Sequence, residues 1–171
     1  LDKDSQGLLL LTNDGDLSNS IQKSVNNHEK EYRVRVNKPI TDEFLTQMAA
    51  GVPILDTVTK KCRLYKIDNY SFKIIITQGL NRQIRRMCEY FGYKVVNLKR
   101  LRVINIRLGN LRPGEYRHLT KEEETELRRL VERKEEVKTK REEAQPDNKN
   151  EQNVVGNKRY VSWKRETESK N

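Results

Sequence analysis

The first apolar run of the chain follows a short polar stretch. Residues 8–11 are all leucine and are closed by TNDGD, which predicts a strand buried on both faces and then an Asp-Gly turn. Asp16 follows this turn at a position typical of a helix N-cap. The helix that it would cap is short, with apolar positions at Leu17, Ile21 and Val25.

Period-two alternation is clearest in EYRVRV. One face of this predicted strand carries Glu31, Arg33 and Arg35, and the other carries Tyr32, Val34 and Val36. Pro39 ends the strand, and TDEFLTQMAAG predicts a capped helix that stops at Gly51. Two further strands are predicted in KKCRLYKI and SFKIIIT, on either side of the turn residues Asp68 and Asn69.

Residues 81–92 have the period of an amphipathic helix. The apolar stripe consists of Ile84, Met87, Cys88 and Phe91, and the spacing places Arg82, Arg85, Arg86 and Glu89 on the opposite, exposed face. The next segment, VVNLKRLRVINIRL, is rich in β-branched residues and predicts strand.

The last helical pattern is LTKEEETELRRLVERK, which opens with a capping box formed by Thr120 and Glu123. Its apolar positions become sparse after Val131, so we expect the helix to fray from about residue 134 and the remainder to be disordered. Hairpin-like strand pairs without a βαβ repeat predict an α+β fold with a mostly antiparallel sheet and flanking helices. We therefore expect a folded domain in residues 1–134 and a charged, disordered tail in residues 135–171.

Composition adds a basic folded body to this picture. Hydrophobic residues make up 34% of the chain and charged residues 35%. Residues 121–171 hold 14 basic and 13 acidic residues, whereas residues 1–120 hold 21 basic and 12 acidic ones. Nearly all of the formal charge of +10 is thus in the part expected to fold, which favours a shaped polyanion site over a loose basic arm.

Several function classes find no support in the sequence. Cys62 and Cys88 are 26 residues apart and the only histidines are His28 and His118, so no zinc-ligand spacing occurs. We expect two reduced thiols, a cytoplasmic location and no membrane contact, since no apolar stretch is long enough to span a bilayer. The motifs GxSxG, GxGxxG and the P-loop are also absent.

Three features could carry chemistry, and the pattern alone leaves each of them open. The arginine face of helix 81–92 is either a solvated surface or an anion site, because guanidinium groups match phosphate oxygens in pairs. Tyr32 is either a core residue or a platform on which a base stacks. Asp2 is one of four nearby aspartates, with Asp4, Asp14 and Asp16, and spacing does not choose among them.

Four motifs in order resemble a known family. LDKDSQGLLLLTNDGD is similar to the catalytic motif of the RsuA-type ribosomal RNA pseudouridine synthases, KEYRV to their tyrosine motif and QGLNRQIRRMCEYFGY to their arginine motif. LKRLRVINIRLGNLRPGEYRHLT resembles the closing strands of that family, while NHEKEY and GVPILDTVTKKC favour its RluF branch. The matches extend over about residues 1–130.

The resemblance implies a reaction and the residues that perform it. Such enzymes cleave the C1′–N1 bond of a uridine, rotate the uracil and rejoin it through C5, without a cofactor or metal. By motif position Asp2 would be the essential carboxylate, Tyr32 would stack on the uracil, and Arg85 would pair with Asp2. Arg82, Arg86, Lys60 and Lys61 would contact RNA phosphates.

The implied substrate is a stem-loop of 23S ribosomal RNA, acted on by a monomer. The alternatives are a transfer RNA or dual-specificity synthase, and a non-catalytic RNA-binding or ribosome-assembly module. The family's small N-terminal RNA-binding domain and the Gly-Arg before its leucine–aspartate pair are not in the sequence. We therefore expect residues 1–171 alone to be less than fully active.

Overall fold

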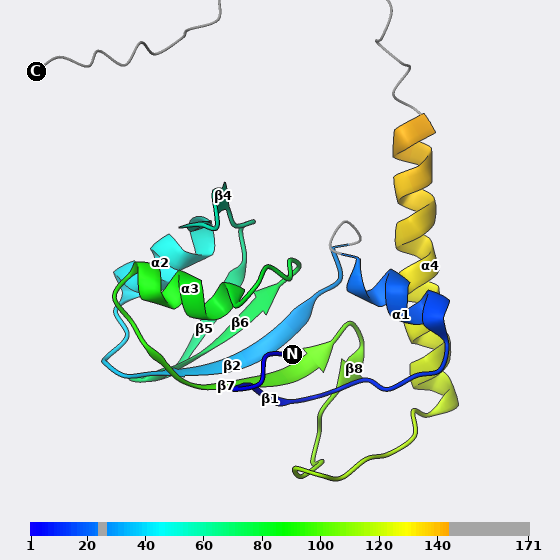
Figure 1. The fold of residues 1–171 in the computed structure, drawn as a ribbon, viewed down its shortest axis with the longest axis horizontal. Helices are drawn as coiled ribbons and strands as arrows, with labels where there is room; N and C mark the ends of the chain where they lie inside the picture. The colour runs from blue at the N-terminus through cyan, green and yellow to red at the C-terminus, as the bar shows by residue number, and fades with distance from the viewer. Residues whose placement is uncertain (24–26, 144–171) are drawn as a thin grey trace, which may run out of the picture.

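A six-stranded sheet organises the chain (Figure 1). The computed structural model describes residues 1–23 and 27–143, with residues 133–143 described by their backbone alone. The strand order is β1-β7-β2-β6-β5, with β8 pairing to β7; only the β1–β7 pair is parallel. The strands are β1 (Gln6–Gly7), β2 (Lys30–Val36), β5 (Arg63–Asp68), β6 (Ser71–Ile76), β7 (Val95–Val103) and β8 (Ile106–Arg107). This arrangement confirms the predicted α+β fold.

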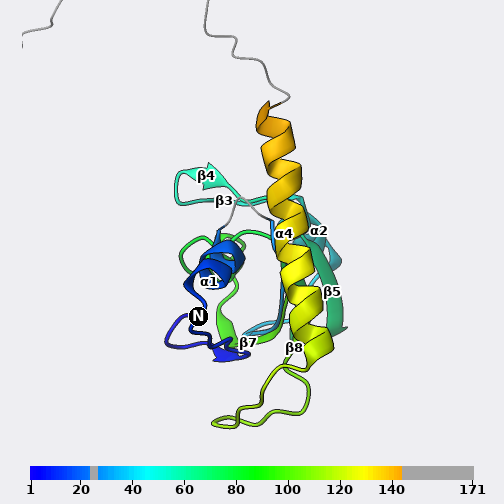
Figure 2. The same ribbon diagram turned by 90° about the vertical axis from the view of Figure 1, so that its right-hand side faces the viewer.

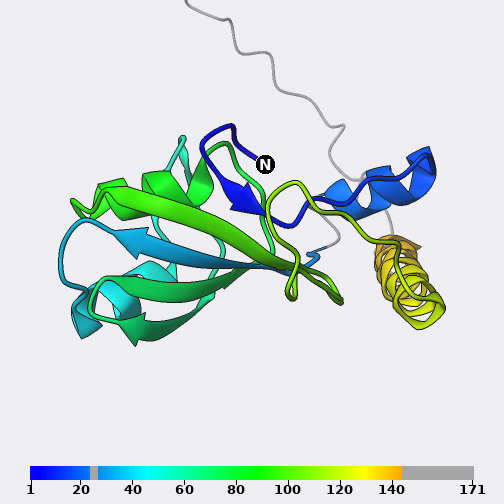
Figure 3. The same ribbon diagram turned by 90° about the horizontal axis from the view of Figure 1, so that it is seen from below.

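Two helices cover one face of the sheet, and among residues 1–23 and 27–143 no helix lies on the opposite face (Figures 1 and 3). The helices are α2 (Asp42–Ala50) and α3 (Gln83–Tyr90). Phe44 and Met48 of α2 and Met87 of α3 are buried in one core with residues of β2 and β6, such as Val34 and Phe72. A small hairpin of β3 (Pro53–Ile54) and β4 (Thr57–Val58) follows α2.

A second core lies at the end of the sheet (Figure 2). It joins helices α1 (Gly15–Gln22) and α4 (Lys121–Glu143) to the segment around β8. Leu8, Val103, Ile106 and Leu127 are buried there, against the partly buried Leu17. Among the described residues, no helix combines the length and the apolar character that crossing a membrane requires.

Local signals predicted β2 and α2 correctly. In β2, Tyr32, Val34 and Val36 are buried while Arg33 and Arg35 are exposed, as period-two alternation requires. In α2, the Thr41 hydroxyl accepts a hydrogen bond from the Phe44 amide at 3.1 Å, and Gly51 follows as the C-cap residue. The predicted capping box at the start of α4 is present too, with Thr120 and Glu123 bonded reciprocally at 3.1 and 3.0 Å.

The prediction of a four-leucine buried strand was wrong. The strand ends at Gly7, and the leucines follow it as an extended segment without a partner strand. Leu8 is buried in the second core and Leu10 packs at its edge, whereas Leu9 is 60% and Leu11 83% exposed. Only one side of the segment meets a core, so consecutive apolar residues alternate between burial and solvent.

Three helix ends also differ from the prediction. The N-cap of α1 is Asp14, whose carboxylate accepts from the Leu17 amide at 2.9 Å; Asp16 is in the first turn and Val25 is outside the described residues. Helix α3 begins only at Gln83, because Arg82 adopts a left-handed backbone with φ +48°. Helix α4 continues past residue 134 to Glu143, through a sequence of strong helix formers. The rest of the predicted tail, residues 144–171, is outside the described residues.

A break in strand register affects both faces of the sheet. Glu31 of β2 pairs with Arg102 of β7, but the next residue, Tyr32, pairs with Arg100, so Leu101 is an extra residue on β7. Because opposed residues share a face, Arg100 lies on the helix-covered side with Tyr32. Arg102 lies on the other side, where its Nε is 3.1 Å from the Glu31 carboxylate in a buried ion pair.

Gly7 is expected to be essential to the β1–β7 pairing. Its φ is +105°, and a Cβ at this position would approach the Arg100 carbonyl oxygen to 2.2 Å. We expect Gly7→Ala to lower the free energy of unfolding by more than about 1 kcal/mol in urea denaturation. Gly15→Ala is the control, because a Cβ there meets nothing within 4 Å. Equal stability of the two variants would contradict the close contact at Gly7.

Candidate active site

The segment that carries Asp2 is a tight turn ahead of β1. The Ser5 amide donates to the Asp2 carbonyl oxygen at 3.0 Å, which closes the turn. The Gly7 backbone then lies against β7, which fixes the C-terminal side of the turn. Asp2 itself is partly exposed.

Tyr32 lies close enough to Asp2 for the two side chains to interact electrostatically. Burial raises the pKa of the Tyr32 phenol above its ordinary value; Arg100 opposes this rise through its charge and a hydrogen bond, and the Asp2 carboxylate adds to it. The structure thus places two of the three predicted catalytic residues near each other. The phenol stays protonated at neutral pH.

Arg100 is a site residue that the sequence analysis missed. Its guanidinium acts on the Tyr32 phenol, whose pKa it lowers through charge and hydrogen bonding, and its Nε donates to the Leu8 carbonyl oxygen at 2.8 Å. It therefore ties the tyrosine to the segment that follows the Asp2 turn. The extra residue at Leu101 turns Arg100 toward Tyr32, and nothing in the alternation of KRLRV reveals that irregularity.

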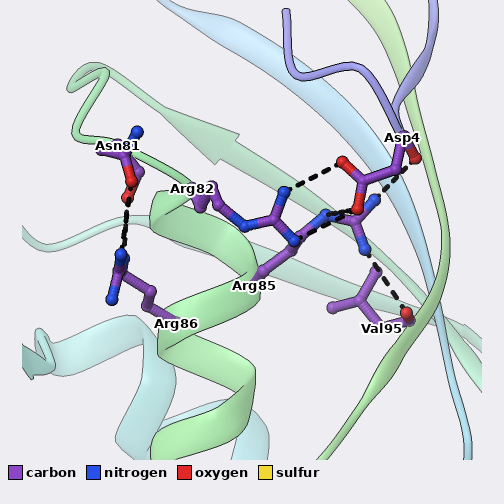
Figure 4. Close-up of polar contacts among 6 residues, drawn as sticks. All are labelled: Asp4, Asn81, Arg82, Arg85, Arg86 and Val95. Atoms are coloured by element: carbon purple, nitrogen blue, oxygen red, sulfur yellow. Dashed lines mark hydrogen bonds and ion pairs between the residues drawn. The ribbon is translucent and has the colours of Figure 1, made fainter.

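Arg85 is buried beneath the turn, which corrects the prediction of an exposed arginine face. Its side chain is only 9% exposed. Its Nη2 donates to the Asp4 carbonyl oxygen at 2.7 Å and its Nη1 to the Val95 carbonyl oxygen at 3.4 Å (Figure 4). Backbone oxygens from two separate segments therefore fix the guanidinium.

The carboxylate partner of Arg85 is Asp4, whereas the sequence analysis expected Asp2. The Nε of Arg85 lies 3.5 Å from Asp4 Oδ2, an ion-pair distance. Arg82 binds the same carboxylate in a bidentate manner, with Nη1–Oδ1 and Nη2–Oδ2 distances of 3.0 and 3.1 Å (Figure 4). The hydrogen bond from Arg82 is the main cause that lowers the pKa of Asp4.

The other predicted RNA contacts are not part of this cluster. Arg86 bonds to Asn81, through Nε to its carbonyl oxygen at 3.1 Å and through Nη2 to its side-chain oxygen at 3.3 Å (Figure 4). Lys60 and Lys61 follow the β3–β4 hairpin and are exposed. The Lys60 amide donates to the Gln78 side chain at 2.9 Å, which links this segment to the loop before α3.

Neither cysteine is suited to nucleophilic chemistry. Both are free thiols, as predicted. Burial raises the pKa of Cys62 to about 11 and that of Cys88 to about 12, so neither forms a thiolate at neutral pH. Within the described part of the chain, no three residues among His, Cys, Asp and Glu are grouped so that they could hold a metal ion.

Comparisons with known proteins point to RNA modification. A family model described as RNA pseudouridylate synthase matches residues 1–90. The Salmonella typhi protein named dual-specificity RNA pseudouridine synthase RluF is 59% identical over 132 residues, 77% of this chain and 46% of that protein. The protein of the same name from Escherichia coli O6:H1 is 53% identical over 161 residues, 94% of this chain and 53% of that protein. The chain thus spans about half the length of these curated relatives.

A solved structure has the same fold. It is titled as a crystal structure of pseudouridylate synthase, and it is 34% identical with a TM-score of 0.70. The alignment covers 76% of this chain and 56% of the solved one. The similarity in sequence and the similarity in structure therefore agree.

The burial of Arg85 gives a test of the geometry that needs no substrate. Lysine lacks the planar fork that reaches the Asp4 and Val95 carbonyl oxygens together. We expect Arg85→Lys to lower the free energy of unfolding by about 1–3 kcal/mol in urea denaturation, because buried acceptors lose their donors. Arg86→Lys is the matched control on the same helix, with an expected change within about 0.5 kcal/mol. A larger loss in the control than in Arg85→Lys would contradict this assignment.

Proposed function

The chain belongs to the RNA pseudouridylate synthase family, and on that premise we propose that it isomerises uridine to pseudouridine at specific sites in RNA. The resemblance to the RsuA-type enzymes and their RluF branch is confirmed. The observation that carries the proposal is the match of the family to residues 1–90, which include Asp2, Tyr32 and Arg85 together.

The proposed reaction exchanges one glycosidic bond for another. The C1′–N1 bond breaks and a C1′–C5 bond forms. The proton on C5 is then lost, and N1 gains a proton. The product is an isomer of the substrate, so the reaction needs no external oxidant or reductant.

We assign Asp2 as the carboxylate that starts this exchange, either by attack on C1′ or by promoting loss of the C2′ proton. For either route it must be ionised in a site dry enough to hold a base. Asp2 interacts electrostatically with Arg82 and with Tyr32, and Asp4 of the same turn binds Arg82 and Arg85.

Tyr32 is the proposed platform for the flipped uracil. Its ring is held at the inner side of the sheet, and stacking of a base on an aromatic ring is worth about 1–3 kcal/mol. Extraction of the uridine from its stack costs a few kcal/mol, which contacts to the RNA backbone would offset. We also propose that Tyr32 assists the later loss of the C5 proton.

For the RNA backbone we propose contacts from Lys60, Lys61 and Arg86. The first two are exposed lysines beside the hairpin, and Arg86 is half-buried at the start of α3. Arg82 was predicted to be another phosphate contact, but Asp4 engages its guanidinium on two nitrogen atoms. The domain division at residue 134 and a monomeric state remain predictions.

For the substrate we propose a stem-loop of 23S ribosomal RNA, in the cytoplasm where ribosomes assemble. Relatives named dual-specificity RNA pseudouridine synthases support a second substrate, and we propose transfer RNA for it. A non-catalytic RNA-binding module is the competing proposal from another class. The joint presence of Asp2, Tyr32 and Arg85 argues against it.

Replacement of Asp2 tests the proposal directly. Asp2→Asn removes the charge and nucleophilicity of the carboxylate but keeps its size, so we expect pseudouridine formation to fall at least a thousandfold. The measurement is pseudouridine content of ribosomal and transfer RNA after incubation with protein. Asp16→Asn, a change at an exposed carboxylate in α1, should keep wild-type activity. Undiminished product from Asp2→Asn would exclude the proposed role.

The salt dependence of RNA affinity tests whether the basic residues in 1–120 bind phosphates. Residues 1–120 carry a net charge of +9, so RNA binding should release counterions. We expect the affinity for a stem-loop RNA to fall about tenfold or more between 50 and 200 mM salt, measured by fluorescence anisotropy. Joint replacement of Lys60 and Lys61 by glutamine should reduce the slope of log K against log salt by about 1–2, whereas Lys121→Gln in α4 should not. An RNA affinity that does not change between 50 and 200 mM salt would contradict phosphate binding by residues 1–120.

A further inference from the structure

One carboxylate connects the Asp2 turn to the start of α3. Asp4 is in the turn, and its two arginine partners, Arg82 and Arg85, come from the arginine motif, 78 and 81 residues further along the chain. We propose that Asp4 is a positioning residue, which holds Asp2 in place by clamping its turn onto Arg82 and Arg85. This inference rests on the function proposed above, and it gives that site a second essential aspartate.

The turn needs such a clamp because its other attachment is short. Strand β1 contains only Gln6 and Gly7, and these two residues pair with Lys99 and Arg100 of β7. The hydrogen bond from the Ser5 amide to Asp2 shapes the turn but attaches it to nothing outside the turn. The Asp4 contacts supply a second attachment, on the side of the turn that faces α3 (Figure 4).

The clamp differs from an ordinary surface ion pair in two respects. Arg85 is buried and donates to the Asp4 backbone as well as facing its side chain, so the turn is held by its main chain too. Arg82 adopts a left-handed backbone directly before α3. This conformation costs free energy in a residue with a Cβ, so it persists only where neighbouring contacts stabilise it. Its bidentate pairing with Asp4 is such a contact.

The clamp also changes the role of Arg82. A guanidinium whose two terminal nitrogens both bind a carboxylate has little left for a phosphate. The hydrogen bond from Arg82 keeps the pKa of Asp4 below its ordinary value, so the carboxylate is ionised throughout the neutral range. Loss of Arg82 should therefore resemble loss of the Asp4 charge and should not resemble loss of an RNA contact.

The test compares turnover with RNA affinity in five variants of the full protein. Asp4→Asn keeps the shape of the side chain and removes its charge, and we expect kcat to fall at least tenfold while the Kd for RNA stays within threefold. Arg82→Gln should give the same pattern, and the double variant should be no slower than either single one, because both break one clamp. Asp4→Glu, which retains the carboxylate, should recover part of kcat, and Asp16→Asn should behave as wild type.

A second measurement, hydrogen exchange, reports on the Asp4 contacts without any RNA substrate. Hydrogen exchange of the Ser5 amide should accelerate at least tenfold in Asp4→Asn, while the amides of α3 keep their protection and the melting temperature shows that the variant is folded. Wild-type kcat in Asp4→Asn, a loss of RNA affinity alone, or unchanged Ser5 exchange would each overturn the proposal. If wild-type protein forms no pseudouridine, the proposed function is wrong. Hydrogen exchange of the Ser5 amide then still tests whether Asp4 holds the turn in place.

Discussion

A buried guanidinium needs oxygen acceptors, and this requirement at Arg85 organises the site. The Arg85 side chain cannot shed its charge, so each unpaired N–H in the interior would be costly. Its acceptors come from the polar turn before β1 and from the start of β7, and the β1 segment itself pairs with β7 over only two residues. Hydrogen bonds from two Arg85 nitrogens therefore join the beginning of the chain to the start of β7, where Val95 pairs with Val36 of β2.

The parts of this protein that follow a local rule were predictable from sequence. Strand β2 alternates because one of its faces meets a core, and α2 begins and ends where Thr41 and Gly51 cap it. The four leucines misled the prediction, because an apolar run does not reveal whether one side or two sides will be covered. Only the tertiary arrangement, with a single core beneath Leu8 and Leu10, decides that.

The site was predicted less completely than the fold, for a similar reason. Family motifs pointed to Asp2, Tyr32 and Arg85, but the partner of Arg85 depends on which of two aspartates, two residues apart, faces it. Spacing within a turn carries no such information. Arg100 was missed because its orientation depends on a break in register, and alternation in KRLRV would place it on the same face as Arg102.

That break, at Leu101, has a consequence for how the gene can change. Arg100 and Arg102 are two positions apart, yet they serve opposite faces of the sheet, one at Tyr32 and the other at Glu31. If Leu101 were deleted, both arginines would have to find partners from a regular strand, and one of the two contacts would be lost. Substitution of Leu101 changes only a side chain. Deletion of Leu101 would change which face of the sheet Arg100 or Arg102 lies on, and so would alter contacts on both faces. Natural selection should therefore tolerate different residues at this position but should hold the number of residues in β7 constant.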